Sequence, residues 1–213
     1  DLSIGSQRPC VLRTSMKLLG NLRLARDVCC SPTGALERWR PTMEHVLTYP
    51  RSVYREDHEA LRSSVRRFLE RECVPRQAQW EQQGRVDRET WLKAGREGFL
   101  CTTMDPKWGG AGADFGHTAV IVEEIARSGV NGLGFGLHSD IVAPYIERLG
   151  TEQQKQRWLP ACATGEMILA IAMSEPGAGS DLKAIRTRAE RDGDHYVING
   201  SKTFISNGLN CDL

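Results

Sequence analysis

The sequence predicts an α+β protein, in which an all-helical region over residues 43–165 is followed by the start of a β-domain over residues 166–213. Two observations support this prediction. Apolar residues recur every three or four positions through most of residues 43–165, which is typical of amphipathic helices. From Ile185 to Ser206 apolar and polar residues alternate instead, across the turn dipeptides Asp192-Gly193 and Asn199-Gly200.

Composition excludes several classes of function. The chain has 213 residues, of which 40% are hydrophobic, enough for one or two domains with cores. Its net charge of +1 gives no indication of binding to nucleic acid or to an anionic membrane surface. No apolar run approaches the ~20 residues of a transmembrane helix. The seven cysteines show no zinc-binding spacing, and their odd number is typical of a reducing compartment.

Residues 1–42 differ from the rest of the chain. They hold seven Arg or Lys residues against three acidic ones and show little periodicity, so we expect them to lie outside the fold. They are either sequence upstream of a start at Met43 or an organelle-targeting presequence. We expect a start at Met43 in a bacterial cytoplasmic protein, with a mitochondrial matrix protein as the alternative.

The first predicted helices follow from spacing and capping signals. Apolar residues between Glu56 and Cys73 fall on one helical face, and Pro75 is expected to end this helix. Asp87 is a candidate N-cap for a second helix, and Asp114 for a third that ends at Gly129.

The next helix carries an apolar stripe with four-residue spacing, ended by Gly150. Such a stripe either packs in the core or lines a pocket. A last helix opens with the capping box that starts at Thr151. His138 and His195 have no partners at metal-binding spacing, so we expect structural histidines and no metal site. The stripe residues are Leu133, Leu137, Ile141, Tyr145 and Leu149.

The segment with the densest turn signals follows the apolar run Ile168–Met173, which suits a buried strand. Pro176, Gly177 and Gly179 allow a tight turn whose successive N–H groups form an anion-binding concavity. The neighbouring acids Glu175 and Asp181 would repel an anion, so we expect them to point away and either cap backbone N–H groups or pair with a basic side chain. The turn therefore suits a phosphate-bearing ligand. It lacks the residues of a P-loop and of a dinucleotide-binding βαβ unit.

Two segments resemble the acyl-CoA dehydrogenase family. Ala172–Ala184 (AMSEPGAGSDLKA) resembles the signature of that family, and Lys202–Gly208 (KTFISNG) resembles its second flavin-contacting segment. The likeness can be followed from Arg51 to Leu213 and is greatest to the long-chain type. It implies a helical domain, a central β-barrel and a C-terminal helical bundle, of which this chain holds the first and the start of the second.

The resemblance also implies an activity and its site. The family uses FAD to introduce an α,β double bond into acyl-CoA thioesters and passes the electrons to electron-transferring flavoprotein, and its members are commonly homo-oligomers. By resemblance, Ser180 also touches the CoA part of the substrate, and the helix of the stripe lines the acyl pocket with Leu133, Leu137 and Ile141. The implied cofactor-binding residues are Ile171, Met173, Ser174, Gly179, Ser180, Phe204, Ile205 and Ser206.

The catalytic base of the family lies in the domain that would follow Leu213, so no residue here is assigned that role. Glu123 and Glu124 are assigned to a solvated or salt-bridged helix face. We therefore expect the 213-residue chain to be inactive by itself. An acyl-CoA oxidase and a non-catalytic remnant of the family are the alternatives, and chain-length preference stays open.

Overall fold

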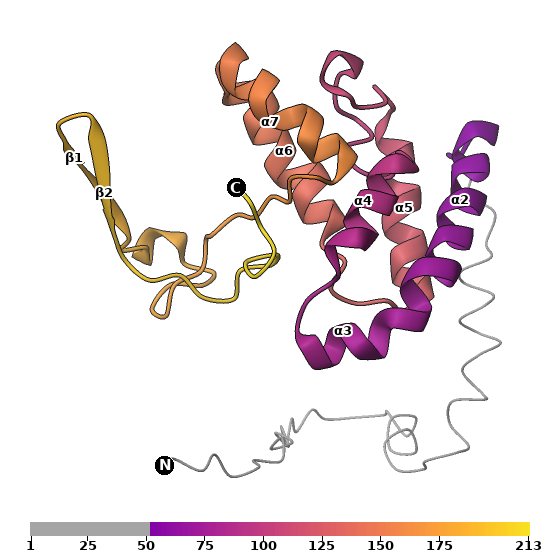
Figure 1. Cartoon of the computed structure of the whole chain (residues 1–213), viewed down its shortest axis with the longest axis horizontal. Helices are drawn as coiled ribbons and strands as arrows, with labels where there is room; N and C mark the ends of the chain where they lie inside the picture. Colours follow the sequence, from indigo (N-terminus) through magenta and orange to yellow (C-terminus); the bar gives the residue numbers. More distant parts are fainter. Residues whose placement is uncertain (1–51) are drawn as a thin grey trace, which may run out of the picture. The chain divides into compact units, whose positions relative to one another are not determined.

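The computed structural model describes residues 52–213, so the predictions for residues 1–42, Met43 and Arg51 lie outside the described residues. The α-helices are α2 (Glu56–Phe68), α3 (Gln77–Gln83), α4 (Arg88–Arg96), α5 (Phe115–Ser128), α6 (Ala143–Leu149) and α7 (Glu152–Thr164). Shorter helical turns are π-helical at Leu69–Cys73 and Leu137–Val142, and 3-10 at Val74–Arg76, Pro106–Trp108 and Leu182–Ala184. Figure 1 shows these helices followed by extended chain and a hairpin. None of the helices described is long and apolar enough to cross a membrane.

The predicted first helix, from Glu56 to Cys73, is present as α2 and the π turn Leu69–Cys73, and it ends just before Pro75. The sequence did not predict that the chain then continues through a 3-10 turn containing Pro75 into α3. Proline is tolerated there because it stands in the first positions of a new turn, where its missing N–H would have no partner. The helical path ends at Gly84, whose φ is 71°.

Two of the three predicted helix caps are confirmed. Asp114 accepts a hydrogen bond from the amide of Gly116 at 3.0 Å, and Thr151 forms the expected capping box with Gln154. Asp87 precedes α4, but its side chain caps no N–H of that helix. Its carboxylate instead accepts hydrogen bonds from side chains of α3, including Trp80 Nε1 at 3.0 Å.

The core of the helical region is built around Trp91 of α4, which is fully buried. Its ring meets those of Phe135 and His138 edge-on, with centroids 4.8 and 5.3 Å away. Helices α4 and α7 pack closely where Gly95 faces Thr164, because a Cβ at Gly95 would overlap the backbone of Thr164. The core therefore requires glycine at this crossing.

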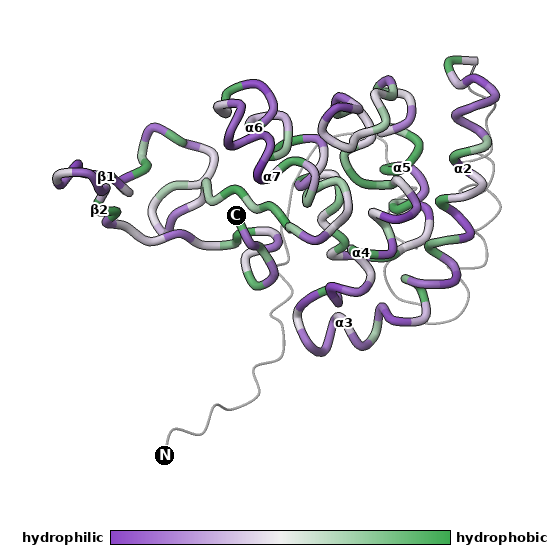
Figure 2. Tube along the Cα trace, turned by 45° about the horizontal axis from the view of Figure 1, so that its top comes forward, coloured by the Kyte–Doolittle hydropathy of each residue, from purple (hydrophilic) through white to green (hydrophobic). Residues whose placement is uncertain are grey.

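The chain beyond α7 is extended and then forms a small antiparallel sheet. Figure 2 shows hydrophobic chain directly beyond α7. Ile168 and Leu169 are buried, yet the run Ile168–Met173 is not a regular strand. It pairs irregularly with the residues just before Leu213, through Ala170 N to Leu213 O at 3.0 Å and Asp212 N to Ile168 O at 2.8 Å.

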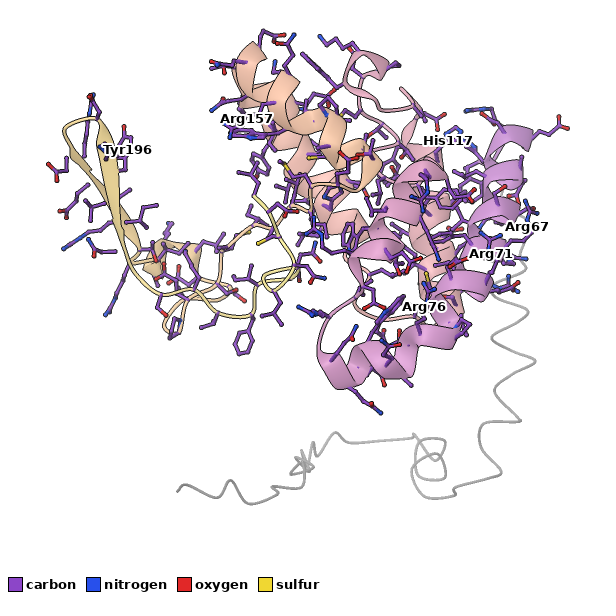
Figure 3. All side chains as sticks on the ribbon, viewed as in Figure 1. Arg67, Arg71, Arg76, His117, Arg157 and Tyr196 are labelled. Carbon is purple, nitrogen blue, oxygen red and sulfur yellow. The ribbon has the colours of Figure 1, made fainter. Side chains whose placement is uncertain are left out.

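The sheet has two strands, β1 (Arg188–Asp192) and β2 (His195–Asn199), paired with Asp192 opposite His195. Asp192-Gly193 lies at their turn as predicted, and Gly193 has a φ of 59°. Both faces of the hairpin are exposed, and Tyr196 projects from it with 67% of its surface accessible (Figure 3). The predicted start of a β-domain is thus present as this hairpin; the part of the chain that the structure describes contains no further strand.

Candidate functional site

The glycine-rich segment forms a tight turn directly after the extended segment. Glu175 and Ala178 exchange backbone hydrogen bonds, Glu175 N to Ala178 O at 2.8 Å and Ala178 N to Glu175 O at 3.1 Å. No atom lies within 4 Å of the position that a Cβ would take on Gly177 or Gly179. The amides of these glycines and of Ser180 donate no hydrogen bond within residues 52–213. The turn therefore presents three free N–H groups beside open space, as an anion site requires.

Both acids beside the turn bind backbone N–H groups, as the sequence predicted. Glu175 accepts hydrogen bonds from the amides of Arg186 at 2.7 Å and Thr187 at 2.9 Å, and Lys202 Nζ lies 2.9 Å from its carboxylate. Hydrogen bonds from Thr187 and Arg186, together with the ammonium of Lys202, lower the pKa of Glu175 to about 2. Asp181 accepts from the amide of Lys183 at 3.1 Å. The two carboxylates thus fasten the glycine-rich turn to the chain that follows it, instead of facing the free N–H groups.

The second family-like segment lies alongside this turn, although the two are about thirty residues apart in the sequence. The amide of Thr203 donates to the carbonyl of Ser174 at 3.0 Å, and Lys202 Nζ donates to the carbonyl of Met173 at 3.1 Å. Met173 is 42% exposed, and Phe204 is 96% exposed with a φ of 54°. Two accessible apolar side chains therefore flank the contact between the segments.

Three serine hydroxyls in these segments make no hydrogen bond to any described residue. Ser174 is half-buried, whereas Ser180 and Ser206 are exposed. A hydroxyl without an internal partner can both donate to and accept from a ligand. Ile171 and Ile205, the remaining predicted contact residues, are half-buried.

The apolar stripe does not form one continuous buried face. Leu133 is 2% exposed and belongs to the main hydrophobic cluster, and Leu137 is half-buried. The exposed fraction then rises to 47% at Ile141, 56% at Tyr145 and 78% at Leu149. The π turn Leu137–Val142 explains this, because it holds more residues per turn and rotates the following side chains away from the core.

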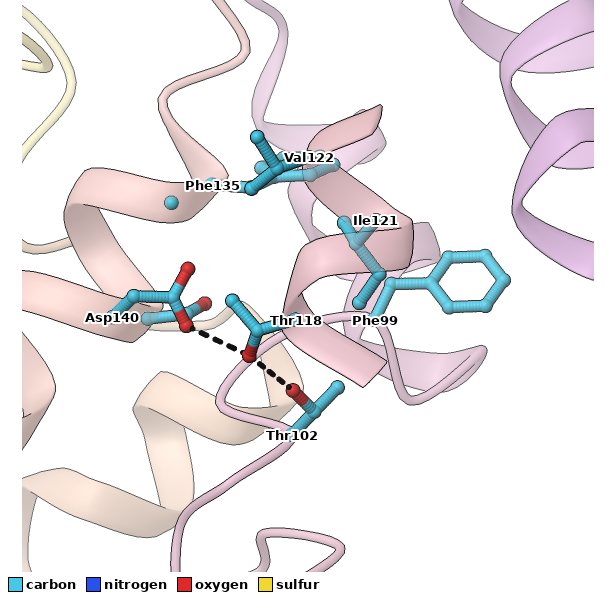
Figure 4. A pocket seen from close by; sticks show the side chains of 9 residues that line it. Phe99, Thr102, Thr118, Ile121, Val122, Phe135 and Asp140 are labelled. Atoms are coloured by element: carbon cyan, nitrogen blue, oxygen red, sulfur yellow. Dashed lines mark hydrogen bonds between the residues drawn. The ribbon is translucent and has the colours of Figure 1, made fainter. Parts of the chain in front are cut away.

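A small pocket lies between this π turn and α5 (Figure 4), with a cavity volume of about 10 Å³. Thr118 donates a hydrogen bond to Asp140 at 3.2 Å, and its hydroxyl lies 3.3 Å from that of Thr102. Burial raises the pKa of Asp140 above its usual range. Helical spacing alone does not find Asp140, because it stands beside the apolar stripe rather than on it. The lining residues are Phe99, Thr102, Thr118, Ile121, Val122, Phe135, Gly136, Ser139 and Asp140.

His138, within the π turn, joins the helices to the segment that leads to the glycine-rich turn. Its Nδ1 accepts a hydrogen bond from the amide of Leu169 at 3.1 Å, so its proton is on Nε2, which donates to the carbonyl of Cys162 at 3.0 Å. Burial lowers the pKa of His138 to about 4. The prediction of a structural, hydrogen-bonded histidine is confirmed.

A group of possible metal ligands that the sequence did not predict lies at the starts of α2 and α5. Asp57, His58 and His117 bring ligand atoms within 4.8 Å of one another. The guanidinium of Arg55 binds the carboxylates of Asp57 at 2.9 Å and Asp114 at 2.7 Å. Both histidine rings also hydrogen-bond Asp114. The carboxylates of this group are thus already paired with a guanidinium, which favours a structural role.

Comparisons with known proteins agree with this geometry. Residues 55–166 match the acyl-CoA dehydrogenase N-terminal domain, and residues 170–213 match the middle domain of the same family. The long-chain specific acyl-CoA dehydrogenase of Sus scrofa mitochondria is 43% identical over 208 residues, covering 95% of this chain and 48% of that protein. This chain thus spans about half the length of the curated relatives it matches.

Solved structures show the same likeness. The acyl-CoA dehydrogenase of Geobacillus kaustophilus is 52% identical with a TM-score of 0.73, over 76% of this chain and 43% of that one. The acyl-CoA dehydrogenase of Bacillus anthracis complexed with FAD is 29% identical with a TM-score of 0.66, over 78% of this chain and 29% of that one. The glycine-rich turn, the segment beside it and the matching domains together show that the chain belongs to the acyl-CoA dehydrogenase family.

Proposed function

We propose that this chain supplies the flavin-contacting part of a long-chain-type acyl-CoA dehydrogenase. The observation that carries the proposal is the glycine-rich turn, whose free N–H groups lie beside the segment Lys202–Gly208. FAD, when bound, would accept the hydride removed from Cβ of an acyl-CoA thioester. The site fits this cofactor because side chains at Gly177 and Gly179 would fill the space in front of the free amides.

The proposed role of each residue follows from its place in the site. Gly179 and Ser180 hold the pyrophosphate with backbone N–H groups and a hydroxyl, while Ser174 and Ser206 donate hydrogen bonds to the polar edge of the flavin. Met173 and Phe204 offer apolar surface to the ring, with support from the half-buried Ile171 and Ile205. Ser180 is proposed to contact the CoA part of the substrate as well.

The acyl chain is proposed to lie along the helix that begins near Phe135. Leu137 and Ile141 support this, since both are partly accessible. Leu133 is packed in the core, so we propose that it shapes the acyl-binding surface from behind rather than lying at its exposed face. These aliphatic side chains favour an aliphatic substrate.

The partners and place of action are part of the same proposal. Electron-transferring flavoprotein is proposed as the electron acceptor, and the protein is proposed to act as a homo-oligomer. A match that covers 95% of this chain extends into residues 1–42, because residues 43–213 make up only about four-fifths of it. Since that relative is mitochondrial, the mitochondrial matrix is favoured over the bacterial cytoplasm. The proposed domains remain 43–165 and 166–213.

The catalytic base is not assigned to any residue from 52 to 213. Glu124, the most buried acid on α5, forms hydrogen bonds with the guanidinium of Arg66 at 2.8 Å. Burial alone would raise the pKa of Glu124, but hydrogen bonds from Arg66 and Arg62 lower it below its usual range. A carboxylate paired in this way is a poor proton acceptor.

Titration of FAD with the chain tests the proposal, with flavin fluorescence as the signal. We expect saturable binding, and at least tenfold weaker binding for Gly179→Val, whose side chain would enter the space before the free amides. Ala189→Val, on an exposed strand of the hairpin, is the matched control and should bind like the wild type. Absence of flavin binding by the wild-type chain would refute the proposed function.

A further inference from the structure

The side chain of Asn207 joins three segments of the chain. Its Nδ2 donates hydrogen bonds to the carbonyl of Leu169 at 3.0 Å and to the carbonyl of Gly134 at 3.4 Å. The backbone carbonyl of Asn207 accepts hydrogen bonds from the amides of Asn210 and Cys211, both at 2.8 Å. One half-buried side chain thus holds the segment Lys202–Gly208 against the extended segment and against the entry to the π-helical turn.

The residues around Asn207 leave room for its amide group and share its hydrogen-bond partners. Gly134 has a φ of 66°, and a Cβ there would overlap the amide group of Asn207. The carbonyl of Gly134 also accepts the amide of His138 at 3.1 Å, while Nδ1 of His138 accepts the amide of Leu169. Asn207 and His138 therefore hold Leu169 from its two sides, one at the C=O and the other at the N–H.

The backbone around Asn207 adopts conformations that need outside support. Phe204 has a φ of 54° and Asn207 a φ of 63°, so two residues other than glycine are left-handed within four positions. Asparagine tolerates this region, whereas phenylalanine adopts it at a cost. The segment is fixed at one end by the hydrogen bond from Thr203 to Ser174 and at the other by Asn207. Residues 204–206, which include Phe204 and Ser206, lie between these two points.

We propose that Asn207 is a positioning residue for the flavin: by holding the end of residues 204–206 against Leu169 and Gly134, it sets where Phe204 and Ser206 meet the cofactor. The inference rests on the proposed function. It adds that flavin contact and the entry to the acyl-binding helix are fixed by the same amide group. A substitution at Asn207 should therefore change how the flavin is bound, by moving residues 204–206 rather than by removing a direct contact.

The test compares the wild-type chain with Asn207→Gly and Asn207→Asp, with Asn131→Gly in an exposed loop as control. Glycine keeps the left-handed backbone and removes only the side-chain hydrogen bonds. We expect FAD to bind Asn207→Gly about tenfold more weakly, as the loss of about two hydrogen bonds allows, and to lose the resolved shoulders of its visible absorption band. Melting temperatures without FAD separate this effect from loss of folding.

The aspartate variant tests whether the two side-chain hydrogen bonds themselves set the affinity for FAD. At pH 7.5 its carboxylate faces two carbonyl oxygens and donates no hydrogen bond, so affinity for FAD should fall below that of Asn207→Gly. Near pH 5 a protonated carboxyl can donate again, and the affinity relative to wild type should partly recover.

Wild-type affinity and spectrum in Asn207→Gly would overturn the inference and leave the proposed function standing. A weakening that only matches the unfolded fraction of the variant would overturn it as well. Failure of the wild-type chain to bind FAD would overturn both.

Discussion

The imidazole of His138 accepts a hydrogen bond from the backbone amide of Leu169 at 3.1 Å, in a position where none of the histidine surface is exposed. The contact joins the π-helical turn to the segment that precedes the glycine-rich turn. Since Nδ1 is the acceptor, protonation of His138 would remove this hydrogen bond and bury a charge.

His138 should therefore make stability depend on pH. Its pKa is about 4 in the folded chain, against about 6.5 when unfolded, so its contribution is fully present above pH 6.5 and is lost as pH falls toward 4. The loss amounts to roughly 3 kcal/mol. Urea unfolding from pH 7.5 to 4.5 measures it. His138→Gln, which does not titrate, should be less stable at pH 7.5 but show a flatter profile, and an equally steep one would contradict the assignment.

Arg66 should matter more for stability than its neighbour Arg67. Arg66 hydrogen-bonds both carboxylate oxygens of Glu124, whose side chain is only 2% exposed, through two contacts of 2.8 Å. Among residues 52–213, the exposed Arg67 hydrogen-bonds only the half-buried Ser64. Arg66→Ala leaves a buried charge with fewer partners and should cost about 2 kcal/mol of unfolding free energy, whereas Arg67→Ala should cost less than about 0.5 kcal/mol. Equal urea midpoints for the two variants would show that Arg66 does not stabilise the buried carboxylate of Glu124.

The close approach of α4 and α7 predicts a difference between two glycines. Gly95→Ala would place a methyl group on the backbone of Thr164, so it should destabilise the fold by about 3 kcal/mol. Gly84→Ala, at a helix end with a φ of 71° and open space around it, should cost only about 1 kcal/mol from backbone strain. Thermal unfolding of both variants measures the two losses of stability. A smaller loss for Gly95→Ala than for Gly84→Ala would mean that α4 and α7 can move apart at this crossing.

Much of the site could be predicted from the sequence because its signals are local. The turn residues lie within one short segment, and Asp181 binds the amide of Lys183, two residues further on. Glu175 binds amides eleven and twelve residues further on, so its partners could not be named from the turn alone. The N-caps Asp114 and Thr151 also act within three residues. Interactions of this range leave a readable pattern.

The features that the sequence did not predict depend on packing. The helical path continues beyond Pro75 because the chain begins a new turn there, and Ile141 is exposed because a π turn rotates it outward. Asp87 bonds a tryptophan indole instead of its own helix. The contacts of Asn207 could not be predicted, because its two carbonyl partners lie about forty and seventy residues earlier in the sequence. The spacing of residues along one element carries no information about such partners.

The π turn at Leu137–Val142 also determines how this region tolerates changes in length. A π turn holds one residue more than an α turn, so deleting a single residue within it would restore continuous α-helical bonding. Everything beyond the deletion would then rotate by about 100° relative to the helix before it. Tyr145 and Leu149, now exposed, would change the direction in which they face, while Asp140 and His138 would lose their register with α5 and with Leu169. Gaps and insertions between related chains are therefore expected to avoid this turn.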